Sequence, residues 1–95
     1  MAKTPPMTLE SAETLALQGL TFLAGDSGRL SRFLTLTGID PGELGGWDGN
    51  HGLQGAVLEH LLADESLLLV FATEIGAGPE TIAPAHALLT GGWQE

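Results

Sequence analysis

The chain has 95 residues, no cysteine and 43% hydrophobic residues, which predicts one small domain held by packing alone and excludes disulfides and thiolate metal sites. Its formal net charge is −9, and residues 33–95 hold nine Asp or Glu but no Lys or Arg. Because binding to phosphate groups requires cations, we expect neither nucleic acid nor a membrane surface as a partner.

The first expected helix follows a short lead. Two adjacent prolines oppose helix formation, so we expect residues 1–7 to be disordered and residues 8–95 to form a single helical domain. Thr8 is a candidate N-cap, and apolar residues recur at helical spacing from there until Gly25. Gly19 lies inside this helix, where glycine costs about 1 kcal/mol. We interpret it as a place where a neighbouring helix approaches closely.

A second short helix and a single turn are expected next. Ser27 is the candidate N-cap of this helix, which should end at Gly38. Asp40 then begins a capping-box pattern, with proline at the first helical position and glutamate at the third. Gly45 and Gly46 stop propagation, so we predict only a 3₁₀-like or single-turn helix.

The apolar stretch from residue 51 to residue 75 is divided by Asp64 and Glu65. A continuous helix of about 25 residues would be long for so small a domain, and Asp64 is a favourable N-cap. We therefore predict two helices, residues 51–63 and 65–75, and the alternative is one helix bent at residue 64. Apolar side chains surround most of the second helix, which predicts that it is central and covered on several sides.

The last helix has two possible starts. It begins at Pro79 and is kinked at Pro84, or it begins at Ala83 with that second proline in the first helical position. Two glycines, the first of them Gly91, should end the helix, and Trp93 is expected to fold back onto the body. No strand pattern is present. The predicted fold is therefore all-α, a compact irregular bundle of five or six short helices.

Two segments of the chain carry a family resemblance. The segments are "RLSRFLTLTGIDP", Arg29 to Pro41, and "LLADESLLLVFA", Leu61 to Ala72. In this order and separation they resemble domain-of-unknown-function family 3572, small bacterial proteins, with the similarity extending from Leu15 to Leu89. The family has no assigned activity, so the resemblance implies a helical fold and no catalytic residue.

Two residue groups imitate metal sites. Asp48, Asn50 and Glu59 occupy the first, third and twelfth positions of a calcium-loop pattern, but the fifth position offers no ligand and the sixth lacks the required glycine. His60 and Asp64 lie one helical turn apart without a third ligand at a suitable spacing. We predict no metal ion, no cofactor and no catalytic residue. His60 is interpreted as a surface or half-buried histidine that is hydrogen-bonded to a carboxylate.

The leading functional interpretation is a non-catalytic protein-interaction module. A homodimer is one form that such a module could take. Its partner is expected to be basic or apolar at the contact surface, or to be a second copy of the chain. The N-terminus lacks a secretory signal and no apolar run reaches about 18 residues, so we expect a soluble, cytoplasmic protein.

Four residues are candidate partner contacts. Arg29 and Arg32 share one helical face, and Trp47 and Trp93 adjoin glycines near helix ends. Tryptophans in such places anchor interfaces or cover the end of a small core. The alternative function is a small enzyme or ligand-binding domain that uses the two arginines, or His60 with Asp64.

Overall fold

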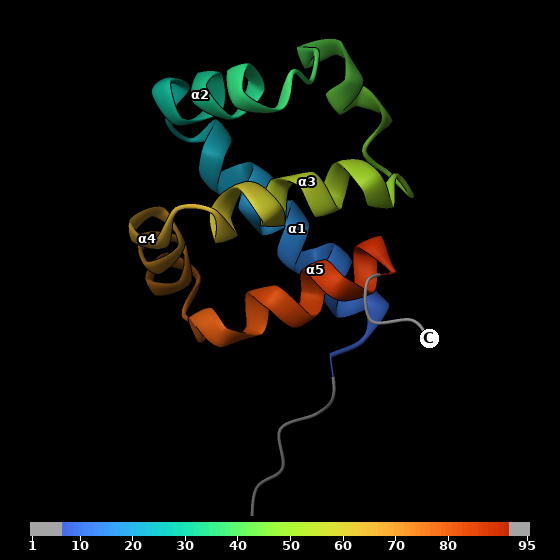
Figure 1. Ribbon diagram of the computed structural model, residues 1–95, viewed down its shortest axis with the longest axis vertical. Helices are drawn as coiled ribbons and strands as arrows, with labels where there is room; N and C mark the ends of the chain where they lie inside the picture. The colour runs from blue at the N-terminus through green and yellow to red at the C-terminus, as the bar shows by residue number, and fades with distance from the viewer. Residues whose placement is uncertain (1–6, 92–95) are drawn as a thin grey trace, which may run out of the picture.

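The computed structural model describes residues 7–91, which form five α-helices and two 3₁₀ turns (Figure 1). In chain order the elements are α1 (Leu9–Ala24), α2 (Ser27–Thr37), η1 (Pro41–Gly46), α3 (His51–Leu62), α4 (Glu65–Ile75), η2 (Pro79–Thr81) and α5 (Ile82–Thr90). No strand occurs in this part of the chain. The prediction of an all-α bundle of short helices is confirmed.

Helices α1, α3 and α5 form the centre of the bundle, and each contacts the other two. In Figure 1, α3 and α5 run in opposite directions, and α1 crosses behind α3. Gly19 lets α1 and α3 approach each other, because a Cβ atom there would lie 2.9 Å from Cγ1 of Val57 and 3.2 Å from Cδ1 of Leu61. The interpretation of this glycine as a close-approach position is confirmed.

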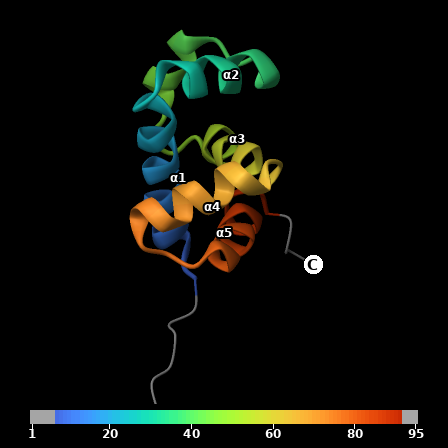
Figure 2. The same cartoon turned by 90° about the vertical axis from the view of Figure 1, so that its left-hand side faces the viewer.

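Two further units pack around this centre. Figure 2 shows α4 in front of the bundle and α2 above it. The Phe71 ring of α4 lies 5.3 Å from the Phe22 ring of α1, centroid to centroid. Phe33 is the buried residue of α2, and its ring meets His60 of α3 edge-on at 5.2 Å. Helix α2 is therefore attached through few side chains and leaves much of its surface open.

Side-chain caps set the starts of α4 and η1 as predicted. The Asp64 carboxylate accepts a hydrogen bond from the Leu67 N–H at 3.2 Å, so residues 51–75 form two helices rather than one bent helix. At η1, Asp40 accepts from the Gly42 N–H at 2.9 Å, and Glu43 accepts from the Asp40 N–H at 3.1 Å. This reciprocal pair confirms the capping box. The element is 3₁₀ as predicted, but its six residues include Gly45 and Gly46 and so extend beyond a single turn.

The structure corrects the assignment of the α2 cap. Asp26, not Ser27, is the N-cap, and its carboxylate accepts from the Gly28 N–H at 2.9 Å and the Arg29 N–H at 3.3 Å. Ser27 has already entered the helix. Asp and Ser cap helices about equally well, so two adjacent candidates leave the position open by one residue.

The prediction that the helix after Asp64 is central was wrong. Helix α4 buries only Phe71 and Ala72, whereas Leu69 and Val70 are 46% and 44% exposed. The central helix is α3, because α1 and α5 approach it from two sides. The apolar character of α4 therefore produces an exposed apolar surface.

The C-terminal helix begins late, close to the second of the two predicted starts. Pro79 begins the separate turn η2, and α5 begins at Ile82. Pro84 therefore lies in the first turn of α5, where a backbone N–H has no helical partner to lose. Trp93 and the lead of residues 1–6 lie outside the described residues. Within residues 7–91, no helix combines the length and the hydropathy needed to cross a bilayer.

Candidate functional site

The outward side of α1 carries an apolar residue within a polar stripe. Leu17 is 49% exposed, and it lies among polar residues that follow helical spacing. We call this stripe, with the two hollows beside it, the α1 face; its helical residues are Glu10, Glu13, Thr14, Leu17, Gln18 and Thr21. The sequence prediction missed Leu17 as a site residue. The signal was present, since an exposed leucine between polar neighbours breaks the amphipathic pattern.

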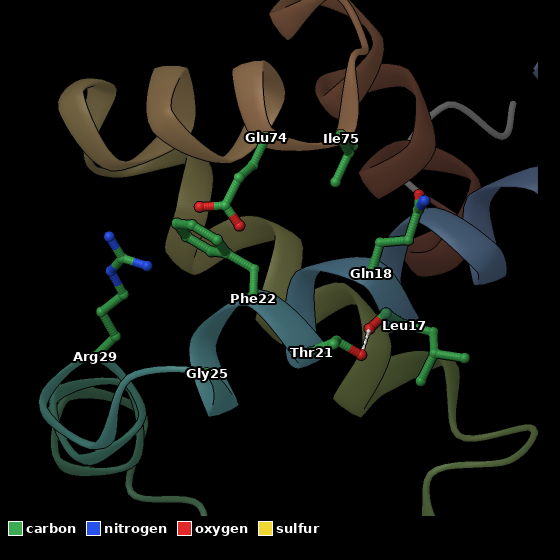
Figure 3. A pocket seen from close by; sticks show the side chains of 8 residues that line it. All are labelled: Leu17, Gln18, Thr21, Phe22, Gly25, Arg29, Glu74 and Ile75. Carbon is green, nitrogen blue, oxygen red and sulfur yellow. Dashed lines mark hydrogen bonds between the residues drawn. The ribbon is translucent and has the colours of Figure 1, made fainter.

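The first hollow lies between α1, α4 and the start of α2, and we call it the Glu74 hollow. It has a volume of about 410 Å³ and is lined by Leu17, Gln18, Thr21, Phe22, Gly25, Arg29, Glu74 and Ile75. Figure 3 shows Glu74 reaching from α4, and Arg29 extending from α2, toward the Phe22 ring. The Arg29 guanidinium carbon lies 4.3 Å from that ring's centroid. Arg29 thus covers an aromatic side chain while its charge stays at the rim.

The second hollow lies beside the first half of α1, and we call it the Asp48 hollow. It has a volume of about 260 Å³ and is lined by Glu10, Glu13, Thr14, Leu17, Trp47, Asp48, Gly49 and Gln54. The His51 Nε2 lies 2.7 Å from a Glu13 carboxylate oxygen. Gln54 is only 2% exposed and donates from Nε2 to the Trp47 carbonyl at 2.9 Å. Three carboxylates therefore surround a small hollow, and a hydrogen bond to the backbone fixes the Gln54 side chain in its wall.

Leu17 and Glu74 connect these hollows to the exposed part of α4. Leu17 lines both the Glu74 and Asp48 hollows. Glu74 also lines a further hollow of about 380 Å³, whose other lining residues are Leu69, Val70 and Thr73. Leu17 on α1 and Leu69 and Val70 on α4 therefore belong to one run of adjoining hollows, in which acidic side chains outnumber the single arginine.

Trp47 and Arg29, two predicted partner contacts, both line the α1 face. Trp47 is half-buried and packs against the core, so it covers the core and also borders the Asp48 hollow. Arg32 does not join Arg29, because the two arginines line different hollows. Within residues 7–91 neither arginine has a carboxylate oxygen within 4.0 Å.

The structure does bring Arg32, His60 and Asp64 together. They line a hollow of about 320 Å³, which we call the His60 hollow, at the junction of α2, α3 and α4. The pKa of His60 is lowered from its ordinary value of 6.5, first because the ring is partly buried and second because of the nearby Arg32 charge, while Asp64 acts in the opposite direction. Partial burial and the Arg32 charge therefore favour the neutral form of the His60 ring.

The expected hydrogen bond between His60 and a carboxylate does not form within the described residues. Asp64 instead uses its carboxylate to cap α4, and the His60 ring packs on Phe33. An activated histidine requires a partner that orients it and stabilises its charged form. Asp64 is near enough to favour the charged form, but within residues 7–91 no carboxylate hydrogen-bonds to the His60 ring and orients it.

A groove between α2 and α3 exposes Leu36, which is 62% accessible. This Leu36 groove has a volume of about 520 Å³ and is lined by Leu36, Thr37, Ile39, Ala56, Glu59, His60 and Ala63. It shares Leu36, His60 and Ala63 with the His60 hollow. The groove lies beside the last turn of α2, in which Thr35, Leu36 and Thr37 are exposed.

The calcium-like residues serve other purposes in the structure. The Asn50 side chain accepts from the Leu53 N–H at 3.0 Å and thereby caps α3. Glu59 lies 3.6 Å from Nε2 of His86 on α5. Within residues 7–91, no three His, Cys, Asp or Glu side chains form a group that could hold a metal ion.

Comparison with known proteins identifies the family. No curated protein and no solved structure matches the chain. A family model described as protein of unknown function (DUF3572) matches residues 9–92, which includes all the helices and turns of the structure. The match confirms the resemblance carried by the two segments that begin at Arg29 and Leu61. The chain therefore belongs to the DUF3572 family.

Proposed function

We propose that the protein is a non-catalytic protein-interaction module that binds its partner on the α1 face. The observation that carries this proposal is Leu17, which is half-exposed and lines two hollows on a helix of 16 residues. Exposed apolar residues with a polar rim are typical of binding surfaces. Leu69 and Val70 extend the same surface onto α4.

Charge favours a basic partner. The rim of the α1 face holds four carboxylates, on Glu10, Glu13, Asp48 and Glu74, against the single guanidinium of Arg29. The whole chain is also acidic, with a net charge of −9. Opposite charges steer association and set the register of a complex. Because salt screens such attraction, the affinity for a basic partner should fall as ionic strength rises.

The alternative, a small enzyme or ligand-binding domain, has less support. The two arginines line separate hollows, so they do not form one anion site. Asp64 is engaged in capping α4 rather than in orienting His60. The His60 hollow remains the place where such an activity would have to reside.

A pair of matched variants tests the proposal. Leu17→Asp places a charge in the centre of the α1 face, and Leu36→Asp makes the same change at another exposed leucine. Partners captured from lysate by the tagged full chain are identified by mass spectrometry, purified and rebound to each variant. We expect Leu17→Asp to abolish binding, Leu36→Asp to retain it, and added salt to weaken it. A purified partner that binds Leu17→Asp as well as wild type would refute the assignment of this face.

A second candidate function is weak self-association through the Leu36 groove, which has the most exposed large apolar side chain described. Two chains of net charge −9 repel each other, and salt screens this repulsion over about 10 Å at 0.1 M. Self-association should therefore strengthen with salt, opposite to binding of a basic partner. Sedimentation should show a mass above 9.8 kDa at high concentration and salt for wild type and Leu17→Asp, but not for Leu36→Asp. A wild-type monomer under all conditions would exclude it.

A further inference from the structure

The two hollows of the α1 face have a separation that a helix can match. The lining residues that belong to α1 or to its C-cap, Gly25, centre about seven residues later in the Glu74 hollow than in the Asp48 hollow. At a rise of about 1.5 Å per residue, these two sets of lining residues are centred about 11 Å apart along the helix axis. Residues i and i+7 of a partner helix share one face and have this same separation. Leu17 lies between the two hollows and would face the turn of the partner helix between positions i and i+7.

The hollows differ in chemistry. The Glu74 hollow has apolar side chains from Leu17, Phe22 and Ile75, with its charges on Glu74 and Arg29. The Asp48 hollow has carboxylates and no cationic Lys or Arg. Its buried Gln54 also has a side-chain oxygen, Oε1, without a hydrogen-bond partner among residues 7–91. An ammonium or guanidinium group donates several hydrogen bonds and accepts none, so it complements this second set of acceptors.

We propose that the α1 face binds an amphipathic helix with an apolar anchor at position i and a Lys or Arg at position i+7. The apolar side chain enters the Glu74 hollow and the cation enters the Asp48 hollow. A small residue at i+3 or i+4 leaves room for Leu17. This inference rests on the proposed function, because it names the kind of partner that the α1 face takes.

The order of the two anchors sets the direction of the partner. The Asp48 hollow adjoins the N-terminal half of α1, and the Glu74 hollow adjoins its C-terminal half. A partner that runs antiparallel to α1 therefore carries its cation after its apolar anchor. That position is nearer the C-terminus of the partner helix, where the helix dipole favours a positive charge.

The test uses three fluorescent alanine-based helical peptides of identical composition. The first has leucine at i, alanine at i+3 and i+4, and lysine at i+7. The second moves the lysine to i+5, which lies on another side of the helix. The third places the lysine seven residues before the leucine. Fluorescence anisotropy measures each affinity for the full chain, for Leu17→Asp and for Asp48→Asn, with circular dichroism to verify folding.

We expect the first peptide to bind at least tenfold more tightly than the second. The third can fill both hollows only by running parallel to α1 with its lysine nearer the N-terminus, where the helix dipole disfavours a positive charge, so it should bind more weakly than the first by a smaller factor. Leu17→Asp should remove this binding, and Asp48→Asn should weaken the first peptide several-fold while leaving the second unchanged. Equal affinities for the three peptides, all lost with Leu17→Asp, would overturn the spacing and leave the α1 face as the binding surface. Affinities that Leu17→Asp does not change would overturn both this inference and the proposed function. No detectable binding of the first peptide would overturn the inference alone, since the captured partner tests the α1 face separately.

Discussion

Substitution of Gly19 by alanine measures how closely α1 and α3 are packed. In a solvent-exposed helix this substitution stabilises the folded protein by about 1 kcal/mol, because alanine has the higher helix propensity. Here the new Cβ would lie 2.9 Å from Val57 Cγ1 and 3.2 Å from Leu61 Cδ1, both on fully buried side chains. Val57 is β-branched and cannot easily turn away. Overpacking of this kind costs about 1–3 kcal/mol, so the net change should be a loss of about 0–2 kcal/mol.

Gly52→Ala is the matched control. Gly52 is an exposed residue of α3, and a Cβ there would make only an ordinary contact, 3.6 Å from the Asn50 side-chain oxygen. The free energy of unfolding of Gly52→Ala should rise by up to about 1 kcal/mol from helix propensity alone. Urea denaturation of both variants gives the difference, expected at about 1–3 kcal/mol. If Gly19→Ala were as stabilising as Gly52→Ala, α1 and α3 would not be in close contact at this point and the central packing described here would be wrong.

Three further predictions concern a cap, a histidine and metals. Asp64→Ala should cost about 0.5–2 kcal/mol and Asp64→Asn much less, since asparagine can still accept the hydrogen bond from the Leu67 N–H; equal losses in denaturation would argue against the cap. Because the pKa of His60 is lowered in the folded state, the unfolded chain binds its proton first, so stability should fall as pH drops below 6.5 and level off below the folded pKa. His60→Gln should remove that part of the pH dependence, and an unchanged profile would exclude this histidine as its source. Millimolar calcium or stoichiometric zinc should leave the melting temperature unchanged, because a ligand that binds only the native state must raise it; a rise of several degrees would reveal a site that the geometry does not indicate.

The candidate site could be predicted only in part from the sequence. The sequence predicts Trp47 and Arg29 as partner contacts, and both line the α1 face. Their neighbours Leu17 and Glu74 were missed, because the Glu74 hollow joins two helices that are about 50 residues apart in the sequence. Arg29 and Arg32 were expected to act together. Residues three apart on a helix are offset around its axis, and the structure places different neighbours beside each of them.

The sequence by itself determined where most helices begin and end. The starts at Asp40 and Asp64 depend on hydrogen bonds to backbone groups within three residues, and Gly38 and Gly76 end helices with the positive φ that glycine adopts easily. Such interactions are local, so a short stretch of sequence contains all of their partners. This locality explains why the division of residues 51–75 into two helices could be predicted.

Only the tertiary structure decided which helix is central. An apolar helix can be buried on all sides or lie at an edge, and its own sequence does not distinguish the two cases. Gly19 and Gly55 allow α1 and α5 to approach α3 closely, since a Cβ at Gly55 would lie 2.7 Å from a Thr90 methyl carbon. With α3 enclosed in this way, α4 remains at the edge, and Leu69 and Val70 stay exposed. The core of so small a domain has room for only some of the apolar helix faces, and which faces are buried depends on how all the helices pack together. The apolar residues of α4 that remain outside the core form the exposed surface beside α1.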